Sequence, residues 1–181
     1  MKAIALLLCL AACNDYPTTI KTPLGIYVVN NDKVKDPYYG NYRQCIFYDS
    51  MLQETDMVFE SVLYAIYTLQ LDDNVYEFNG LDESRLTVCF TPHAIDGLGG
   101  IVAGLTYEGY LAFVALGRNK DQHDIKQTAL AHELLHAIIA RMCILDECSN
   151  DPGHLETGYW YQALPLANYI FGASDGYDSN N

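Results

Sequence analysis

Residues 129–142 read ALAHELLHAIIARM, an almost wholly apolar run that contains the pattern His-Glu-x-x-His. The pattern places His132 and His136 four residues apart, on one face of a helix, where both imidazoles can reach one metal ion. Glu133 lies about 100° round the helix from His132, at the edge of that face. A helix that is apolar nearly all round is buried, so these polar side chains are costly unless a metal ion compensates for their lost hydration. The segment predicts a buried helix with a metal site; the alternative is an ordinary core helix with hydrogen-bonded histidines.

The composition of the chain suits one globular domain. Half of its 181 residues are hydrophobic, which is enough for a substantial core. The formal net charge is −13 at pH 7, whereas a nucleic-acid-binding surface would be basic. We therefore expect a single-domain monomer that does not bind nucleic acid.

The N-terminal segment has the pattern of an export signal. Lys2 supplies a positive start, and residues 3–10 form an apolar run too short to cross a bilayer. The sequence LAAC that ends at Cys13 resembles the lipobox of bacterial lipoproteins. That resemblance implies a signal peptide at residues 1–12, lipidation of Cys13, a tether at residues 13–21 and anchoring in the bacterial cell envelope, outside the cytoplasm, in the periplasm or at the cell surface. The alternative is a plain secretory signal followed by a chance cysteine.

Four cysteines follow the signal and the anchor. Outside the cytoplasm, four cysteines indicate two disulfides, for which three pairings exist. We favour Cys143–Cys148, which closes a tight loop just after the motif helix, and Cys45–Cys89, which ties the N-terminal part to a strand. A zinc site made of cysteines is the competing interpretation, but no Cys-x-x-Cys pair occurs in the chain.

The rest of the chain combines short strands with a second helix. Segments rich in β-branched and aromatic residues predict strands at residues 25–30, 44–48, 86–90, 101–107 and 110–116, the last two joined as a tight hairpin. Apolar residues at helical spacing predict a long amphipathic helix over residues 50–71, begun by a capping box of Ser50 and Gln53. Asp124 is expected to cap the motif helix, and the polar residues 175–181 to form a disordered tail.

The motif and this layout together resemble the zincin superfamily of zinc metalloproteases. The resemblance covers residues 50–156, and the HELLH motif is its specific part. It implies an α+β, zincin-like single domain over residues 22–174, in which a twisted mixed β-sheet packs on a long helix and on a buried active-site helix. In that superfamily the substrate peptide pairs with the edge strand that precedes the active-site helix. Carried onto this chain, the edge is residues 100–106, with Gly104 and Leu105 at the substrate.

The third zinc ligand decides between the branches of this superfamily. Metzincins continue as His-x-x-Gly-x-x-His, but Ile139 and Met142 stand at those positions. Gluzincins use a glutamate on a second helix. Glu156 lies twenty positions after His136, although the sequence pattern of that second helix is absent. His154 stands between them, and imidazole is a common zinc ligand. We favour His154 as the third ligand beside the two motif histidines, with Glu156 as the alternative.

Two carboxylates are further alternatives for this ligand. Asp146 and Asp151 lie in the same region, and carboxylates also ligate zinc. His154 would then be a solvated loop histidine. The aromatic residues 159–161 (YWY) are expected to pack the C-terminal segment on the core rather than to act at the metal.

A zinc site of this kind predicts hydrolysis. Three protein ligands leave a position open for water, and zinc lowers the pKa of that water to about 7. Glu133 would take the proton as water attacks the scissile carbonyl, and would pass it to the leaving amine. The expected function is zinc-dependent endopeptidase activity on a peptide or protein substrate.

Two other functions compete with this one. One is a non-catalytic envelope lipoprotein that uses a zincin-like fold as a binding module, and the other is hydrolysis of a different substrate, such as a cell-wall peptide. Glu133 favours the enzyme over the binding module, because a structural zinc site has no use for a buried carboxylate that is not a ligand.

Overall fold

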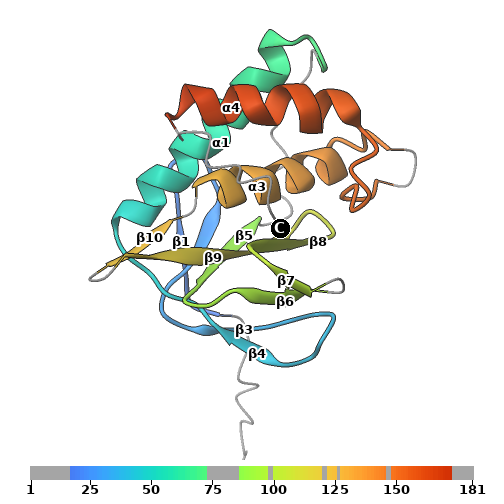
Figure 1. Cartoon of the computed structure of the whole chain (residues 1–181). Coiled ribbons are helices and arrows are strands. Elements are labelled where there is room, and N and C mark those ends of the chain that lie inside the picture. The colour runs from blue at the N-terminus through green and yellow to red at the C-terminus, as the bar shows by residue number, and fades with distance from the viewer. Residues whose placement is uncertain are drawn as a thin grey trace, which may run out of the picture.

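The computed structural model describes residues 17–72, 86–97, 100–119, 122–125, 127–145 and 148–172. They form a mixed β-sheet with helices on one face (Figure 1), so the predicted α+β class is confirmed. Within these ranges no helix combines the length and the apolarity needed to cross a membrane. The expected signal peptide, Cys13 and the tail at residues 175–181 lie outside the described residues.

The main sheet is mixed because a helix crosses over between two of its strands. Its order in the described residues is β1-β2-β5-β9-β10, and β8 also pairs with β9. The bounds are β1 Thr19–Lys21, β2 Tyr27–Val29, β5 Thr87–Thr91, β8 Gly104–Tyr107, β9 Leu111–Asn119 and β10 Gln122–Ile125. Strands β2, β5 and β9 are parallel, and β8 runs antiparallel to β9 with Gly104 opposite Val114. Parallel neighbours need a long crossover, which helix α1 (Ser50–Thr68) supplies between β2 and β5.

Both faces of the sheet are covered, which explains why its central strands are almost wholly apolar. Successive side chains of a strand point to opposite faces. Val88 and Phe90 of β5 therefore pack against the helices, whereas Cys89 packs with Phe113 on the other face. The helical face carries α1, α3 Gln127–Arg141, the π-helical turn Tyr159–Ala163 and α4 Leu164–Ile170. The other face carries two hairpins, β3 Lys33–Lys35 with β4 Tyr42–Gln44, and β6 Ile95–Gly97 with β7 Gly100–Val102 (Figure 1).

Both predicted disulfides are present. Cys45 bonds to Cys89 and ties the chain after β4 to the central strand β5. Cys143 bonds to Cys148 and closes a loop that begins two residues after α3 ends. The second disulfide therefore confines the chain just before the loop that carries His154.

Strand β8 is fixed from the hairpin side of the sheet by a buried carboxylate. Asp36, in the turn after β3, is fully buried. It accepts hydrogen bonds from the Tyr107 hydroxyl at 2.8 Å and from Arg43 Nε at 2.7 Å. The backbone N–H groups of Tyr38 and Tyr39 donate to the same carboxylate. Because Tyr107 is the last residue of β8, this network attaches the edge strand to the β3–β4 hairpin.

The strands predicted at residues 25–30, 86–90 and 110–116 correspond to β2, β5 and β9 with shifted ends, whereas the other two are placed differently. The strand expected at residues 44–48 lies earlier, at β4. After β4 the chain turns, because it forms the disulfide at Cys45 and a backbone hydrogen bond to the carbonyl of Phe90. The strand expected at residues 101–107 is interrupted at Ala103, since β7 pairs with β6 while β8 pairs with β9.

Three expectations about boundaries are wrong. The N-cap of α1 is Asp49, and no side chain caps this helix, so there is no capping box of Ser50 and Gln53. Asp124 belongs to strand β10, where backbone pairing with β9 replaces a capping role. Thr19–Lys21 pairs with β2 as β1, so the ordered domain begins before residue 22 and includes part of the expected tether.

Candidate metal centre

Three histidine side chains converge beside α3. His132 and His136 lie one turn apart on this helix, and their Nε2 atoms are 3.1 Å apart. The Nε2 atom of His154, which precedes the π-helical turn, lies 3.4 Å from that of His136. The candidate ligand atoms of the three residues lie within 4.8 Å of one another. Three imidazoles arranged in this way could hold a metal ion, with a coordination position left for water or substrate.

Of the alternatives for the third ligand, the structure brings His154 to the motif histidines. Among the described residues, the group that could hold a metal consists of His132, His136 and His154, without Glu156. The backbone N–H of Glu156 instead donates to Asp151. The other alternative, Asp146, lies outside the described residues.

The loop that carries His154 is organised around the Asp151 carboxylate, which is 1% exposed. This carboxylate accepts hydrogen bonds from the N–H groups of Leu155 and Glu156, at 2.8 and 3.0 Å, and from the Trp160 indole at 2.7 Å. Burial acts to raise the pKa of Asp151, but these donors outweigh it and hold the pKa below its ordinary value. His154 adopts a φ of 52°, and its N–H donates to the Asp151 carbonyl. Asp151 is therefore the anchor of the loop and is not one of the grouped ligands.

Trp160 packs against all three histidines. Its ring centroid lies 4.8 Å from that of His132 and 4.3 Å from those of His136 and His154. The expectation that residues 159–161 pack on the core holds for Tyr159 and Trp160, whereas Tyr161 is 72% exposed. The contact of Trp160 with the histidines was missed, because no spacing in the sequence links an aromatic residue to a ligand on another helix.

The two motif histidines are neutral and one is held in a fixed orientation. The carbonyl oxygen of Asn150 lies within hydrogen-bonding distance of His136 Nδ1, and a proton on Nδ1 leaves the Nε2 lone pair for a metal. Burial lowers the pKa of His136 to about 4 and that of His132 to about 3. Neutral imidazole is the form that binds metal ions.

Glu133 is buried against strand β8, with 4% of its surface exposed. The Thr106 hydroxyl donates to Glu133 Oε2 at 2.6 Å and lies 3.1 Å from the Glu133 carbonyl oxygen. A Cβ atom on Gly104 would overlap Oε1 and the rest of the Glu133 side chain, so glycine is needed here to leave room for the carboxyl group. Of the two expected edge residues, Gly104 therefore lies at the site, whereas Leu105 packs on the opposite face of the sheet. Thr106 was missed, although its alternation with Gly104 places it on the same face.

Burial raises the pKa of Glu133 to about 8, although the Thr106 hydrogen bond lowers it. In the metal-free protein Glu133 thus keeps its proton up to about pH 8, whereas the unfolded chain releases it near 4.5. The unfolded state binds fewer protons between these pH values, so stability falls as pH rises.

A glutamine at position 133 cannot ionise, so this loss of stability should be absent from Glu133→Gln. With a chelator present, we expect Glu133→Gln to gain stability relative to wild type between pH 5 and pH 8, measured as the difference in Tm. A difference in Tm that stayed the same from pH 5 to pH 8 would contradict the raised pKa of Glu133.

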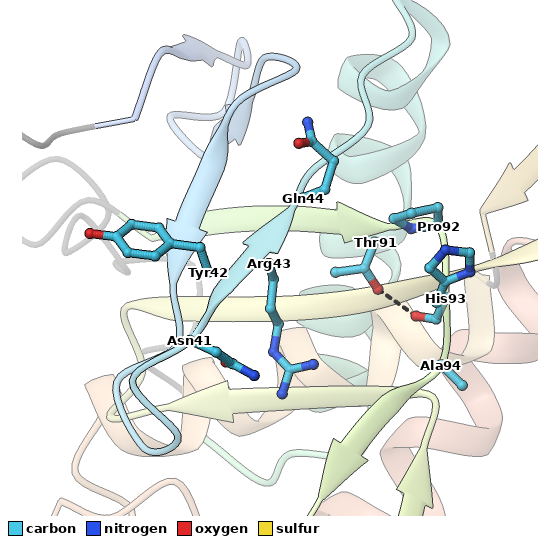
Figure 2. Close-up of a pocket in the computed structure, with 8 residues that line it drawn as sticks. All are labelled: Asn41, Tyr42, Arg43, Gln44, Thr91, Pro92, His93 and Ala94. Atoms are coloured by element: carbon cyan, nitrogen blue, oxygen red, sulfur yellow. Dashed lines mark hydrogen bonds between the residues drawn. The ribbon is translucent and has the colours of Figure 1, made fainter.

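A separate pocket lies on the hairpin side of the sheet (Figure 2). It is lined by β4 with the residue before it and by the end of β5 with the chain that follows, namely Asn41, Tyr42, Arg43, Gln44, Thr91, Pro92, His93 and Ala94. His93 is exposed there, as expected for a loop residue, and its carbonyl accepts a hydrogen bond from Thr91. The pocket contains none of the three histidines that could hold a metal ion.

Comparisons with protein-family models, with curated proteins and with solved structures find no match for this chain.

Proposed function

We propose that this protein hydrolyses peptide bonds with the help of zinc, using His132, His136 and His154 as ligands and Glu133 as the general base. The observation that carries the proposal is the convergence of three imidazoles beside a buried carboxylate that is not one of the grouped ligands. A structural metal site needs ligands but no such carboxylate. An antiparallel edge strand packed beside the motif helix supports this proposal, because the resemblance to zincins implies such a strand at the active site.

The residues present fit zinc. Three imidazole nitrogens form a donor set typical of catalytic zinc. The His136 ring is oriented by a backbone carbonyl, as metal-binding histidines commonly are. When bound, zinc supplies Lewis-acid chemistry, which polarises a carbonyl and lowers the pKa of water to about 7.

Glu133 moves the proton in the proposed reaction. It takes a proton from the attacking water and then gives it to the leaving amine. The Thr106 hydroxyl donates to Oε2, and we assign the proton transfer to Oε1, which lies beside Gly104. A nearby cation favours the ionised carboxylate and opposes the effect of burial on its pKa.

The test of this function combines metal analysis with a digest of a broad peptide library. The domain that starts after Cys13 should hold one zinc ion per chain and cleave peptides, and a chelator should stop cleavage until zinc is restored. A domain that binds zinc and peptides without cleaving them would be a binding module instead. A domain that takes up no zinc would remove the basis of the proposal.

We also propose that Cys13 anchors the protein in the bacterial cell envelope. The support is the order of a positive start, an apolar run and LAAC at the N-terminus. Cys13→Ser should prevent lipidation and release the protein from the membrane fraction, as seen by immunoblotting of fractionated cells. Continued processing at this position together with continued membrane binding would contradict the lipobox interpretation.

A further inference from the structure

Strand β8 offers a peptide very few places to pair. The carbonyl of Ala103 accepts a hydrogen bond from the Ala115 N–H of β9 at 2.8 Å. Because main-chain groups alternate along an antiparallel pair, Gly104 and Thr106 direct theirs away from β9. Among the described strands β8 pairs with β9 alone. An extended peptide added to this edge would therefore pair at Gly104 and at Thr106.

The Thr106 position is already occupied by a side chain of the protein itself. Asn150 Nδ2 donates to the Thr106 carbonyl at 2.6 Å. That carbonyl is the acceptor that the N–H of a paired peptide residue would use. Gly104 differs, because it lies directly against Glu133 and offers its main chain where the reaction would take place.

Asn150 is itself held firmly in place. Its own carbonyl lies within hydrogen-bonding distance of His136 Nδ1. The next residue is Asp151, whose buried carboxylate is bound by three donors. Asn150 thus joins the edge strand to a proposed zinc ligand. It is followed by the loop that carries His154, which we call the ligand loop.

We infer that Asn150 closes one end of the peptide-binding edge, so that the site takes short peptides or the ends of longer ones in preference to the interior of long extended segments. The inference rests on the proposed peptidase function and narrows its substrate class. A peptide paired at Gly104 loses the next pair of main-chain hydrogen bonds at Thr106. A chain that continued in that direction would find the Thr106 carbonyl already bonded to the Asn150 side chain.

The experiment measures how kcat/KM depends on substrate length. Peptides built around one cleaved bond are lengthened one residue at a time, at the N-terminal or the C-terminal end, and assayed with the full-length protein in detergent. In the wild type, lengthening the peptide at one of its two ends should stop raising kcat/KM after the first added residues. Asn150→Ala frees the Thr106 carbonyl and should raise kcat/KM for peptides lengthened at that end by about three- to tenfold, the value of roughly one main-chain hydrogen bond. The gain is expressed as the ratio of kcat/KM between the longest and the shortest peptide, so that a general change in activity cancels.

Two further variants separate this effect from a general disturbance. Asn150→Asp keeps the size of the side chain but removes the donor, and should behave as Asn150→Ala does. Asn41→Ala makes the same substitution at an exposed turn after β3 and should leave the length dependence as in the wild type. Zinc content, measured on every variant, shows whether the ligand loop is intact.

The possible results are distinguishable. A length dependence that is the same in wild type and both Asn150 variants, with zinc retained, overturns the inference and leaves the peptidase function standing. The inference also fails if wild-type kcat/KM keeps rising at both ends, or if both Asn150 variants lose zinc, because Asn150 would then serve the ligand loop. A wild-type protein that cleaves no peptide overturns the proposed function and the inference together.

Discussion

Glu133→Gln should keep zinc bound while peptide hydrolysis is lost. The side chain is not among the grouped ligands, so the metal should stay. Glutamine has the same shape and still offers an acceptor to the Thr106 hydroxyl, so the packing against Gly104 is preserved. What disappears is the group that accepts the proton. General-base catalysis contributes roughly 10²–10⁴ to a rate, and we expect kcat to fall by at least about 10².

The measurement is kcat on a cleaved peptide, with zinc content determined on the same sample. Glu60→Gln, on the exposed face of α1, is the matched control and should behave as wild type. A Glu133→Gln protein that cleaves like wild type would refute the proposed mechanism. A variant that loses zinc along with activity would show instead that Glu133 supports the metal.

The core of this site was predictable from local sequence, because one helix supplies most of it. Residues four apart on a helix share a face whatever the rest of the fold does, so His132 and His136 could be paired without a structure. The apolar surroundings predicted that α3 is buried, and it packs between the sheet and the other helices. One disulfide was predictable for a related reason, since Cys143 and Cys148 are close neighbours in the sequence. Once that pair is assigned, Cys45 and Cys89 remain as the second pair.

The parts that sequence could not supply are contacts between distant segments. Thr106 reaches Glu133 across 27 positions, and Asn150 reaches Thr106 across 44. No periodicity links such residues, because their approach depends on how β8 is placed beside α3. The same holds for Trp160, whose place against the histidines depends on the turn organised by Asp151.

The errors at element boundaries have a common physical cause. Capping preferences are worth about 1 kcal/mol, and tertiary contacts override them. Asp124 would suit a helix N-terminus, but its segment pairs with β9 instead. The interruption at Ala103 has a similar cause. The residues before it pair with β6 as β7, and the residues after it pair with β9 as β8, so the segment does not form one continuous strand.

Removal of any one of the three histidines should weaken zinc binding severely. Each of His132→Ala, His136→Ala and His154→Ala deletes one of three nitrogens that lie within 4.8 Å of one another. Loss of a group that only orients a ligand costs roughly 10–100-fold in metal affinity, so loss of a ligand should cost more than about 100-fold. Glu156→Ala should have a much smaller effect, because the contact of Glu156 with the ligand loop is made by its backbone N–H.

Trp160 gives a direct measurement of this binding that does not depend on activity. It is the only tryptophan in the chain and contacts all three histidine rings. A change in its fluorescence during titration with zinc should therefore yield Kd for the wild type and for each variant. His93→Ala removes a histidine outside the group and should leave Kd unchanged. If Glu156→Ala weakened zinc binding more than His154→Ala, the third ligand would be the glutamate and the loop would rearrange on binding. If all three histidine variants bound zinc like wild type, the convergence of these rings would have no metal-binding role.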